Sequence, residues 1–326
     1  MNKNKFSIHN LSVDQISNLS RLLALTFIII LGVIISDSFL SLENLSNILT
    51  NASVLIIIGV GQTIAIVTNG PDLSSGSILT ICAVLVAILM KSFGIPFPIA
   101  ILAGLSLGAL IGVVNGVMIS KVGIPSFVST YGLMWAVFGF AYVLLHGYVL
   151  YDFNSSFRFI GNGSLFGFLP MPIVIMVLVV ALGIFVMTKT TYGRRFYAVG
   201  TNNVCAKMSG INVDKTVILA FVSSGFLSAL AGIVLIARIN AVQSDIGSNY
   251  LLSVLATVYM GGASTEGGEG TIQGTIIGAL IITIVYNCMN LLAVPSEWRE
   301  AVIGLLIILT ILTDSFAKKR AEKTII

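Results

Sequence analysis

Few residues in this chain have the types and spacing that catalysis needs. The two histidines, His9 and His146, are far apart and have no carboxylate at a spacing that would complete a metal site. There is no G-x-x-x-x-G-K-[ST] loop to hold ATP phosphates, and no nucleophile elbow or pair of inward carboxylates. The three cysteines suggest neither a disulfide framework nor metal ligands. We therefore expect a protein that is not an enzyme and that uses no cofactor or metal.

Asp72 is the acid with the greatest chemical interest, because it lies close to apolar stretches in the segment Asn69–Gly76. A carboxylate at mid-membrane depth costs about 2.5–3.5 kcal/mol on insertion scales and is normally tied to function or to a partner. Asp72 could line a solute pathway. It could instead cap the following helix by accepting N–H groups near Leu73–Ser75, which is the interpretation we favour.

Other polar residues lie in or beside apolar stretches and form a tentative substrate pathway. With Asp72, these candidates are Asn69, Ser74, Asn115, Asn287 and Asn290. Their side chains could hydrogen-bond the hydroxyl groups of a solute in a cavity. Such residues more often bond neighbouring helices to each other, and this second interpretation stays open.

The segment Met187–Thr216 is the longest polar stretch between two apolar ones, with five basic residues and one acid. Within it, Asn202 suits a helix N-cap and Gly210 suits the position after a helix end. Val204 and Met208 are four residues apart and would share one face of a two-turn helix. Such a helix could dock into a groove on a soluble partner, or the segment could be a plain connecting loop.

The elements that hold these residues are membrane-spanning helices. The chain has 326 residues, of which 56% are hydrophobic and 9% charged, against about 25% charged in soluble domains. A membrane-spanning helix needs about 20 apolar residues, and the chain has room for ten such helices with short loops between them. We expect them near residues 22–35, 52–68, 77–90, 98–120, 126–145, 170–187, 217–237, 250–260, 272–292 and 301–313. The span at 250–260 is too short to cross alone and indicates a broken helix, and Gly261–Gly270 must be irregular backbone.

Small residues predict where the helices pack closely, and basic residues predict which segments face the cytoplasm. Gly104, Gly108 and Gly112 form a stripe on one helix that predicts close packing. The N-terminal segment, the 187–216 loop and the C-terminal tail together carry 12 of the 17 basic residues. By the positive-inside rule these segments are cytoplasmic. We therefore expect a cytoplasmic segment 1–21, a transmembrane domain 22–313 with a cytoplasmic loop 188–215, and a basic cytoplasmic tail 314–326. The two glycine-containing breaks in the helical pattern, Asn69–Gly76 and Gly261–Gly270, could be corresponding points of an internal repeat.

Four sequence blocks resemble ATP-binding-cassette importer permeases of the ribose type, in the branched-chain amino acid/ribose permease superfamily, to which autoinducer-2 permeases are closely related. The blocks are Gly70–Ser77, Gly123–Phe127, Thr190–Ile211 and Gly261–Gly270, in the order of that family. The resemblance identifies Thr190–Ile211 as the loop that couples the permease to its ATPase. The implied coupling residues are Gly193, Arg194, Gly200, Asn202, Val204, Ala206, Met208, Ser209, Gly210 and Ile211. Among them, Val204, Ala206 and Met208 are expected in or near the groove.

The resemblance implies an all-α polytopic fold like that of type II importers, in a bacterial cytoplasmic membrane. It implies translocation of a monosaccharide or related polyhydroxylated solute with three partners: a cytoplasmic ATPase, an extracytoplasmic solute-binding protein and a second permease subunit. Pro71 stands where the family usually has an aliphatic residue, which leaves the solute open. The alternatives are a permease for autoinducer-2, a nucleoside or a branched-chain amino acid, and a secondary transporter that works alone.

Overall fold

Helices make up almost the whole structure. The computed structural model describes residues 13–295 and 297–325. Its longer helices are α1 (Val13–Ile35), α2 (Leu42–Thr68), α3 (Ser75–Lys91), α4 (Phe97–Ser120), α5 (Ser126–Leu145), α7 (Met171–Lys189), α10 (Val213–Ile239), α12 (Ile272–Leu291) and α13 (Trp298–Ile325). Shorter helices are α6 (Ser155–Asn162), α8 (Thr191–Thr201), α9 (Asn203–Met208) and α11 (Tyr250–Met260). Two small antiparallel pairs join β1 (Leu150–Tyr151) to β4 (Ala241–Val242), and β2 (Ser164–Leu165) to β3 (Leu169–Pro170).

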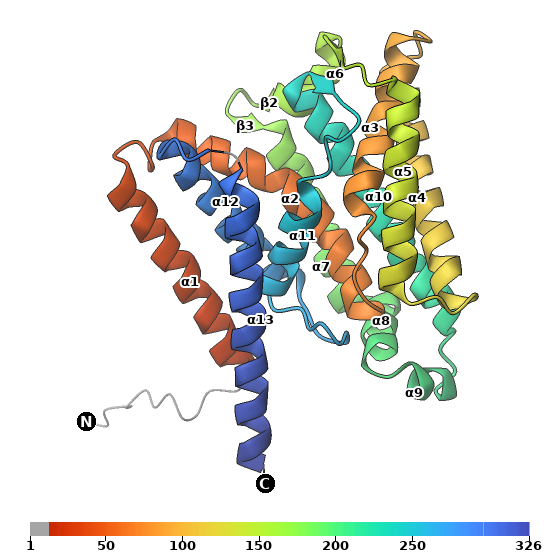
Figure 1. Ribbon diagram of the computed structural model, residues 1–326, viewed down its shortest axis with the longest axis vertical. Helices are drawn as coiled ribbons and strands as arrows, with labels where there is room; N and C mark the ends of the chain where they lie inside the picture. Colours follow the sequence, from red (N-terminus) through yellow and green to blue (C-terminus); the bar gives the residue numbers. More distant parts are fainter. Residues whose placement is uncertain (1–12, 296, 326) are drawn as a thin grey trace.

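Helices α2 and α10 form the centre of the molecule (Figure 1). Most of the apolar stretch of α2 is buried, whereas α4 and α7 expose much of theirs. Such exposed apolar surface suits contact with lipid, because the hydrocarbon core is as apolar as these side chains.

The expected membrane spans agree with the structure in type and position. Six helices are long and apolar enough to cross a membrane, and three shorter apolar helices accompany them, within the described residues. The expected break after a short helix is confirmed, because α11 ends at Met260 and no helix forms before Ile272. The chain is therefore a multi-pass membrane protein, and the number of ten spans stays a prediction.

Close packing between α4 and α10 confirms the prediction from the glycine stripe. A methyl group at Gly108 would lie 2.5 Å from the Gly225 carbonyl oxygen, and one at Gly112 would lie 2.4 Å from that of Phe221. These backbones approach so closely that only glycine fits at the crossing.

Four expected boundaries were wrong. Helix α2 begins at Leu42, inside a segment expected to be an outer loop, because the Ser41 hydroxyl caps it. The expected loop 147–169 contains α6, capped by Asn154. The polar stretch 187–216 holds two helices where one was expected. Helix α13 continues past residue 313, where the last span was expected to end, because residues 305–325 contain neither proline nor glycine to end it. The cytoplasmic tail 314–326 stays a prediction.

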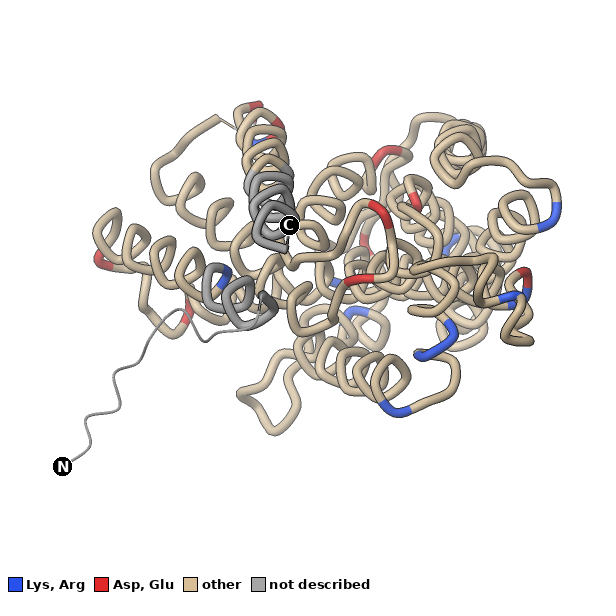
Figure 2. Tube along the Cα trace, turned by 90° about the horizontal axis from the view of Figure 1, so that it is seen from below, with Lys and Arg blue, Asp and Glu red and all other residues tan. Residues whose placement is uncertain are grey.

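The N-terminal end of α1 and the C-terminal end of α13 lie at the same end of the molecule as α8 and α9 (Figure 1). The small strands and α6 lie at the opposite end. Seen from the α8–α9 end, most of the lysine and arginine positions coloured in Figure 2 lie on the side away from α1 and α13, and a few lie on those two helices. Below, these are called the α9 end and the α6 end.

Candidate functional site

Helix α9 has the start and the stop that its sequence predicts. The Asn202 side-chain oxygen accepts the N–H groups of Val204 and Cys205, each at 3.0 Å. Gly210 follows the helix with φ +81°, and the next N–H, of Ile211, donates to the Ala206 carbonyl at 3.0 Å. This is the Schellman arrangement that glycine favours at a helix end. The predicted cap and stop are confirmed.

The two faces of α9 have opposite surroundings. Val204 is 63% exposed and Met208 84% exposed, whereas Ala206 is 4% exposed and packs among Ile119, Val199, Val217 and Phe221. Two residues along a helix turn the side chain by about 200°, so Ala206 lies opposite Val204. The expectation that Ala206 lies in or near a docking groove is wrong, since this face is turned inward. Arg194 and Ser209 are exposed, and Ile211 is half-buried.

Helix α8, which precedes α9, contacts the end of α2 just before the first glycine-rich break and the loop that forms the second one. A Cβ atom at Gly200 would lie 1.7 Å from the Val67 carbonyl oxygen at the end of α2. The same oxygen accepts the Gly268 N–H at 2.9 Å, and the Tyr197 hydroxyl donates to the Gly270 carbonyl at 2.6 Å. Burial raises the pKa of the Tyr197 phenol, which keeps this donor protonated. Gly193, also on α8, packs against the Met187 carbonyl.

Asp72 forms the centre of a closed polar network between α2, α3 and α10. Its carboxylate accepts the Ser74 N–H at 3.0 Å and the Ser224 hydroxyl of α10 at 2.7 Å, and its side chain is fully buried. The Gln62 amide of α2 lies against the Asp72 backbone. In the orientation that satisfies both groups, it donates to the Asp72 carbonyl at 3.1 Å and accepts the N–H at 3.0 Å. The expected bond to an N–H near Leu73–Ser75 is confirmed for Ser74, which is itself the N-cap residue of α3, and bonding between helices adds to it.

The six candidate pathway residues divide into separate groups. Asn115 of α4 donates to the Ser74 hydroxyl at 2.8 Å and so joins the Asp72 network. Asn69 ends α2 and is exposed. Asn287 and Asn290 are on α12, which begins beyond the second break and supplies one wall of a cavity.

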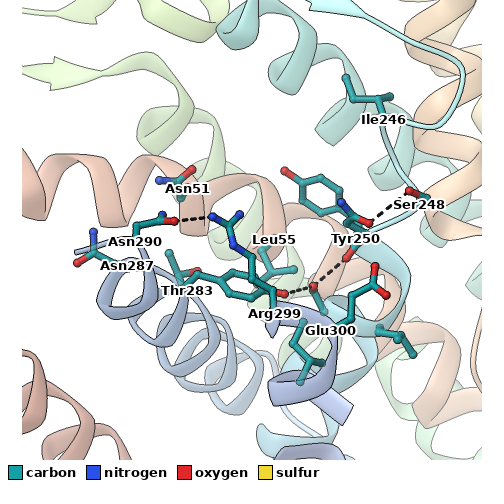
Figure 3. Close-up of a pocket in the computed structure, with 15 residues that line it drawn as sticks. Asn51, Leu55, Ile246, Ser248, Tyr250, Thr283, Asn287, Asn290, Arg299 and Glu300 are labelled. Atoms are coloured by element: carbon teal, nitrogen blue, oxygen red, sulfur yellow. Dashed lines mark hydrogen bonds between the residues drawn. The ribbon is translucent and has the colours of Figure 1, made fainter. Parts of the chain in front are cut away.

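That cavity has a volume of about 340 Å³ and lies between the first part of α2, the residues around the start of α11, the last part of α12 and the start of α13 (Figure 3). The polar residues that line it are Asn51, Ser248, Asn249, Tyr250, Ser253, Thr283, Tyr286, Asn287, Asn290, Arg299 and Glu300. Asn287 exchanges two hydrogen bonds with Asn44 of α2, at 2.7 and 3.1 Å. The helix-bonding interpretation therefore also applies to Asn287.

Sequence reasoning missed most of this lining, including Tyr286, Arg299 and Glu300. A signal was present: Thr283, Tyr286 or Asn287, and Asn290 recur at helical spacing along one face of an otherwise apolar helix. Within the described residues, no group of three or more His, Cys, Asp or Glu could hold a metal ion.

Comparison with known proteins agrees with this arrangement. Residues 44–311 match the family described as branched-chain amino acid transport system / permease component. The ribose import permease protein of Haemophilus influenzae is 36% identical over 95% of this chain and 96% of its own. The fructose import permease protein of Rhizobium meliloti is 34% identical over 90% and 84%. The galactose/methyl galactoside import permease protein of Haemophilus influenzae is 33% identical over 90% and 94%. No solved structure matches significantly. The chain therefore belongs to the family of transport-system permease components.

Proposed function

We propose that this chain is the permease subunit of an ATP-binding-cassette importer that carries a monosaccharide, ribose or a close relative, across the bacterial cytoplasmic membrane. Three relatives at 33–36% identity are import permeases for ribose, fructose and galactose, and this chain covers most of each. ATP hydrolysis is assigned to a separate subunit, because the sequence has no phosphate-binding loop.

The proposal assigns the α9 end to the cytoplasm and the α6 end to the outside. Basic residues on α8 and α9 support this orientation by the positive-inside rule, and both chain termini are then cytoplasmic. An ATPase subunit docks at the α9 end, and a solute-binding protein delivers the sugar at the α6 end. A second permease subunit, identical or paralogous, completes the pathway.

The proposal rests on how α9 packs against the rest of the chain and which of its residues stay exposed. Its exposed edge of Val204 and Met208 offers apolar anchors at i and i+4, the pattern of a helix that docks in a groove. Through α8 the same loop packs against the end of α2, at Gly200 and Val67, and is hydrogen-bonded to the loop 261–270, from Tyr197 to Gly270. A displacement of α9 by the ATPase would therefore reach both breaks, which suits a switch between two states.

The experiment is reconstitution of the chain with its ATPase and solute-binding protein in proteoliposomes. ATP-dependent uptake of labelled ribose is expected, with no uptake when the ATPase is left out. Uptake of leucine or a nucleoside in place of a sugar would overturn the solute class. Uptake on an ion gradient without the ATPase would overturn the importer assignment and favour a secondary transporter.

A further inference from the structure

The cavity between α2, α11, α12 and α13 is separate from the features that the proposed function uses. The Asp72 network lies beside the glycine-rich break that follows α2, while the cavity lies along the first part of that helix, at Asn51 and Leu55. Its volume of about 340 Å³ lies within the usual range of small-molecule sites.

Two arginines orient hydrogen-bond donors at this cavity. Arg238 of α10 donates to the Asn51 side-chain oxygen at 2.8 Å, and Arg299 of α13 donates to the Asn290 side-chain oxygen. With its oxygen held by an arginine, Asn290 presents its NH₂ group as the remaining polar function, whereas the NH₂ group of Asn51 donates to the Asn47 carbonyl at 2.9 Å and keeps one further N–H. The Nε atom of Arg299 is buried and has no partner within the described residues. This part of the cavity therefore offers N–H donors in excess of acceptors (Figure 3).

Acceptors and an aromatic ring complete the lining. The Glu300 side chain points away from Arg299 (Figure 3) and supplies a carboxylate. Tyr286 and Ser253 share a hydrogen bond of 2.9 Å, and either hydroxyl could be its donor. The Arg299 guanidinium lies 5.7 Å from the centre of the Tyr286 ring, a cation–π contact that holds both side chains in place.

We propose that this cavity is a solute subsite within a single permease subunit, and that it takes a neutral polyhydroxylated molecule of monosaccharide size. Each hydroxyl of such a molecule both donates and accepts a hydrogen bond, which suits a lining with N–H donors and carboxylate or hydroxyl acceptors. The lining itself carries one arginine and one glutamate, whose charges cancel, and the Arg238 guanidinium lies behind it, bonded to Asn51. Arg299 and Glu300 are the residues assigned to contact the solute. The inference rests on the proposed function, which supplies the solute class.

The first test is protection against thiol modification in the complete importer. Asn249 is exposed and lines the cavity, so Asn249→Cys is expected to react with a membrane-impermeant maleimide added at the α6 end. The background carries Cys205→Ser, because Cys205 is the exposed native cysteine. Millimolar ribose is expected to slow the reaction severalfold, and leucine is not. Phe166→Cys, exposed at the same end outside the cavity, is the control that ribose must not protect.

The second test compares two arginines at that end of the molecule. Arg299→Gln is expected to raise the KM for ribose uptake about tenfold or more, because it removes a charged donor from the site. Arg158→Gln makes the same change at an exposed residue of α6 and is expected to leave KM unchanged. Equal protection of both cysteines, or equal KM for both variants, would overturn the subsite while wild-type ribose uptake still supports the proposed function. Protection by leucine alone would overturn the ligand class. Absence of ribose uptake by the wild type would refute the proposed function itself.

Discussion

Gly200→Ala tests whether α8 transmits movement from α9 to the membrane helices. The added methyl group would lie 1.7 Å from the Val67 carbonyl oxygen and 2.7 Å from the Gly268 nitrogen. Ordinary van der Waals contact begins at 3.4 Å. The methyl group would be roughly 1.7 Å closer than this to the Val67 oxygen, so α8 and α2 must separate by about that much. Neither neighbour is able to rotate aside, because both are backbone atoms.

The energetic effect follows from this geometry. Overpacking of a tight contact costs about 1–3 kcal/mol. The methyl group would also enter the space between Gly268 N and Val67 O, whose hydrogen bond of 2.9 Å would be weakened or lost, at about 1–3 kcal/mol if the groups stay buried. A few kcal/mol is enough to shift a two-state equilibrium by tenfold or more. The exposed edge of α9 is untouched by the substitution.

The expected result is therefore that Gly200→Ala permease inserts normally and retains the ATPase on purification, while ATP-dependent sugar uptake falls about tenfold or more. Gly139→Ala is the matched control, since a methyl group at this position in α5 has no atom within 4 Å. Wild-type uptake by both variants would refute the role of α8 as the mechanical link.

Three further predictions follow from the same features. Cysteine at Ser156 should react with an impermeant thiol reagent in intact cells and cysteine at Thr201 only after permeabilisation; labelling of Thr201 in intact cells would reverse the orientation. Asp72→Asn should reduce transport only modestly, because the amide keeps one acceptor oxygen and a lost cap costs about 0.5–2 kcal/mol. Abolished transport with normal membrane insertion would favour a pathway role for Asp72. Val204→Glu and Met208→Glu should each strongly reduce co-purification of the ATPase without changing membrane insertion, because the new charge would be unpaired in an apolar contact. Full retention of the ATPase by both variants would make the loop a simple connector.

Local signals explain what the sequence could predict. Helix α5 begins after Pro125, and α9 begins at Asn202 and ends before Gly210, because each of these residues acts on the backbone beside it. The break at 261–270 follows from its glycines, of which four have positive φ. Such signals depend only on neighbours in the chain.

Long-range contacts explain what it could not. The cavity joins Asn51 to residues more than 230 positions later, and no local pattern specifies which helix faces another. The inward turn of Ala206 depends on Phe221 and other residues of distant helices. Helix α8 was missed for a related reason: it is polar and too short to span, so its contacts with α2 and the 261–270 loop were invisible to a search for apolar segments.

The six candidate pathway residues lie in separate places, some in the Asp72 network and others at the cavity. This separation favours different roles for the network and the cavity. The Asp72 carboxyl group accepts hydrogen bonds from the Ser74 N–H, the Ser74 hydroxyl and the Ser224 hydroxyl, and the side chain is 0% exposed. A solute that passed this point would have to break hydrogen bonds to a buried carboxyl group, and a buried polar group left without its partner costs about 1–3 kcal/mol. The cavity instead presents an accessible polar lining that includes the exposed residues Asn249, Asn290 and Glu300. We therefore infer that the Asp72 network fixes the helices around the first break, and that solute recognition within the membrane takes place at the cavity lined by α12 and α13.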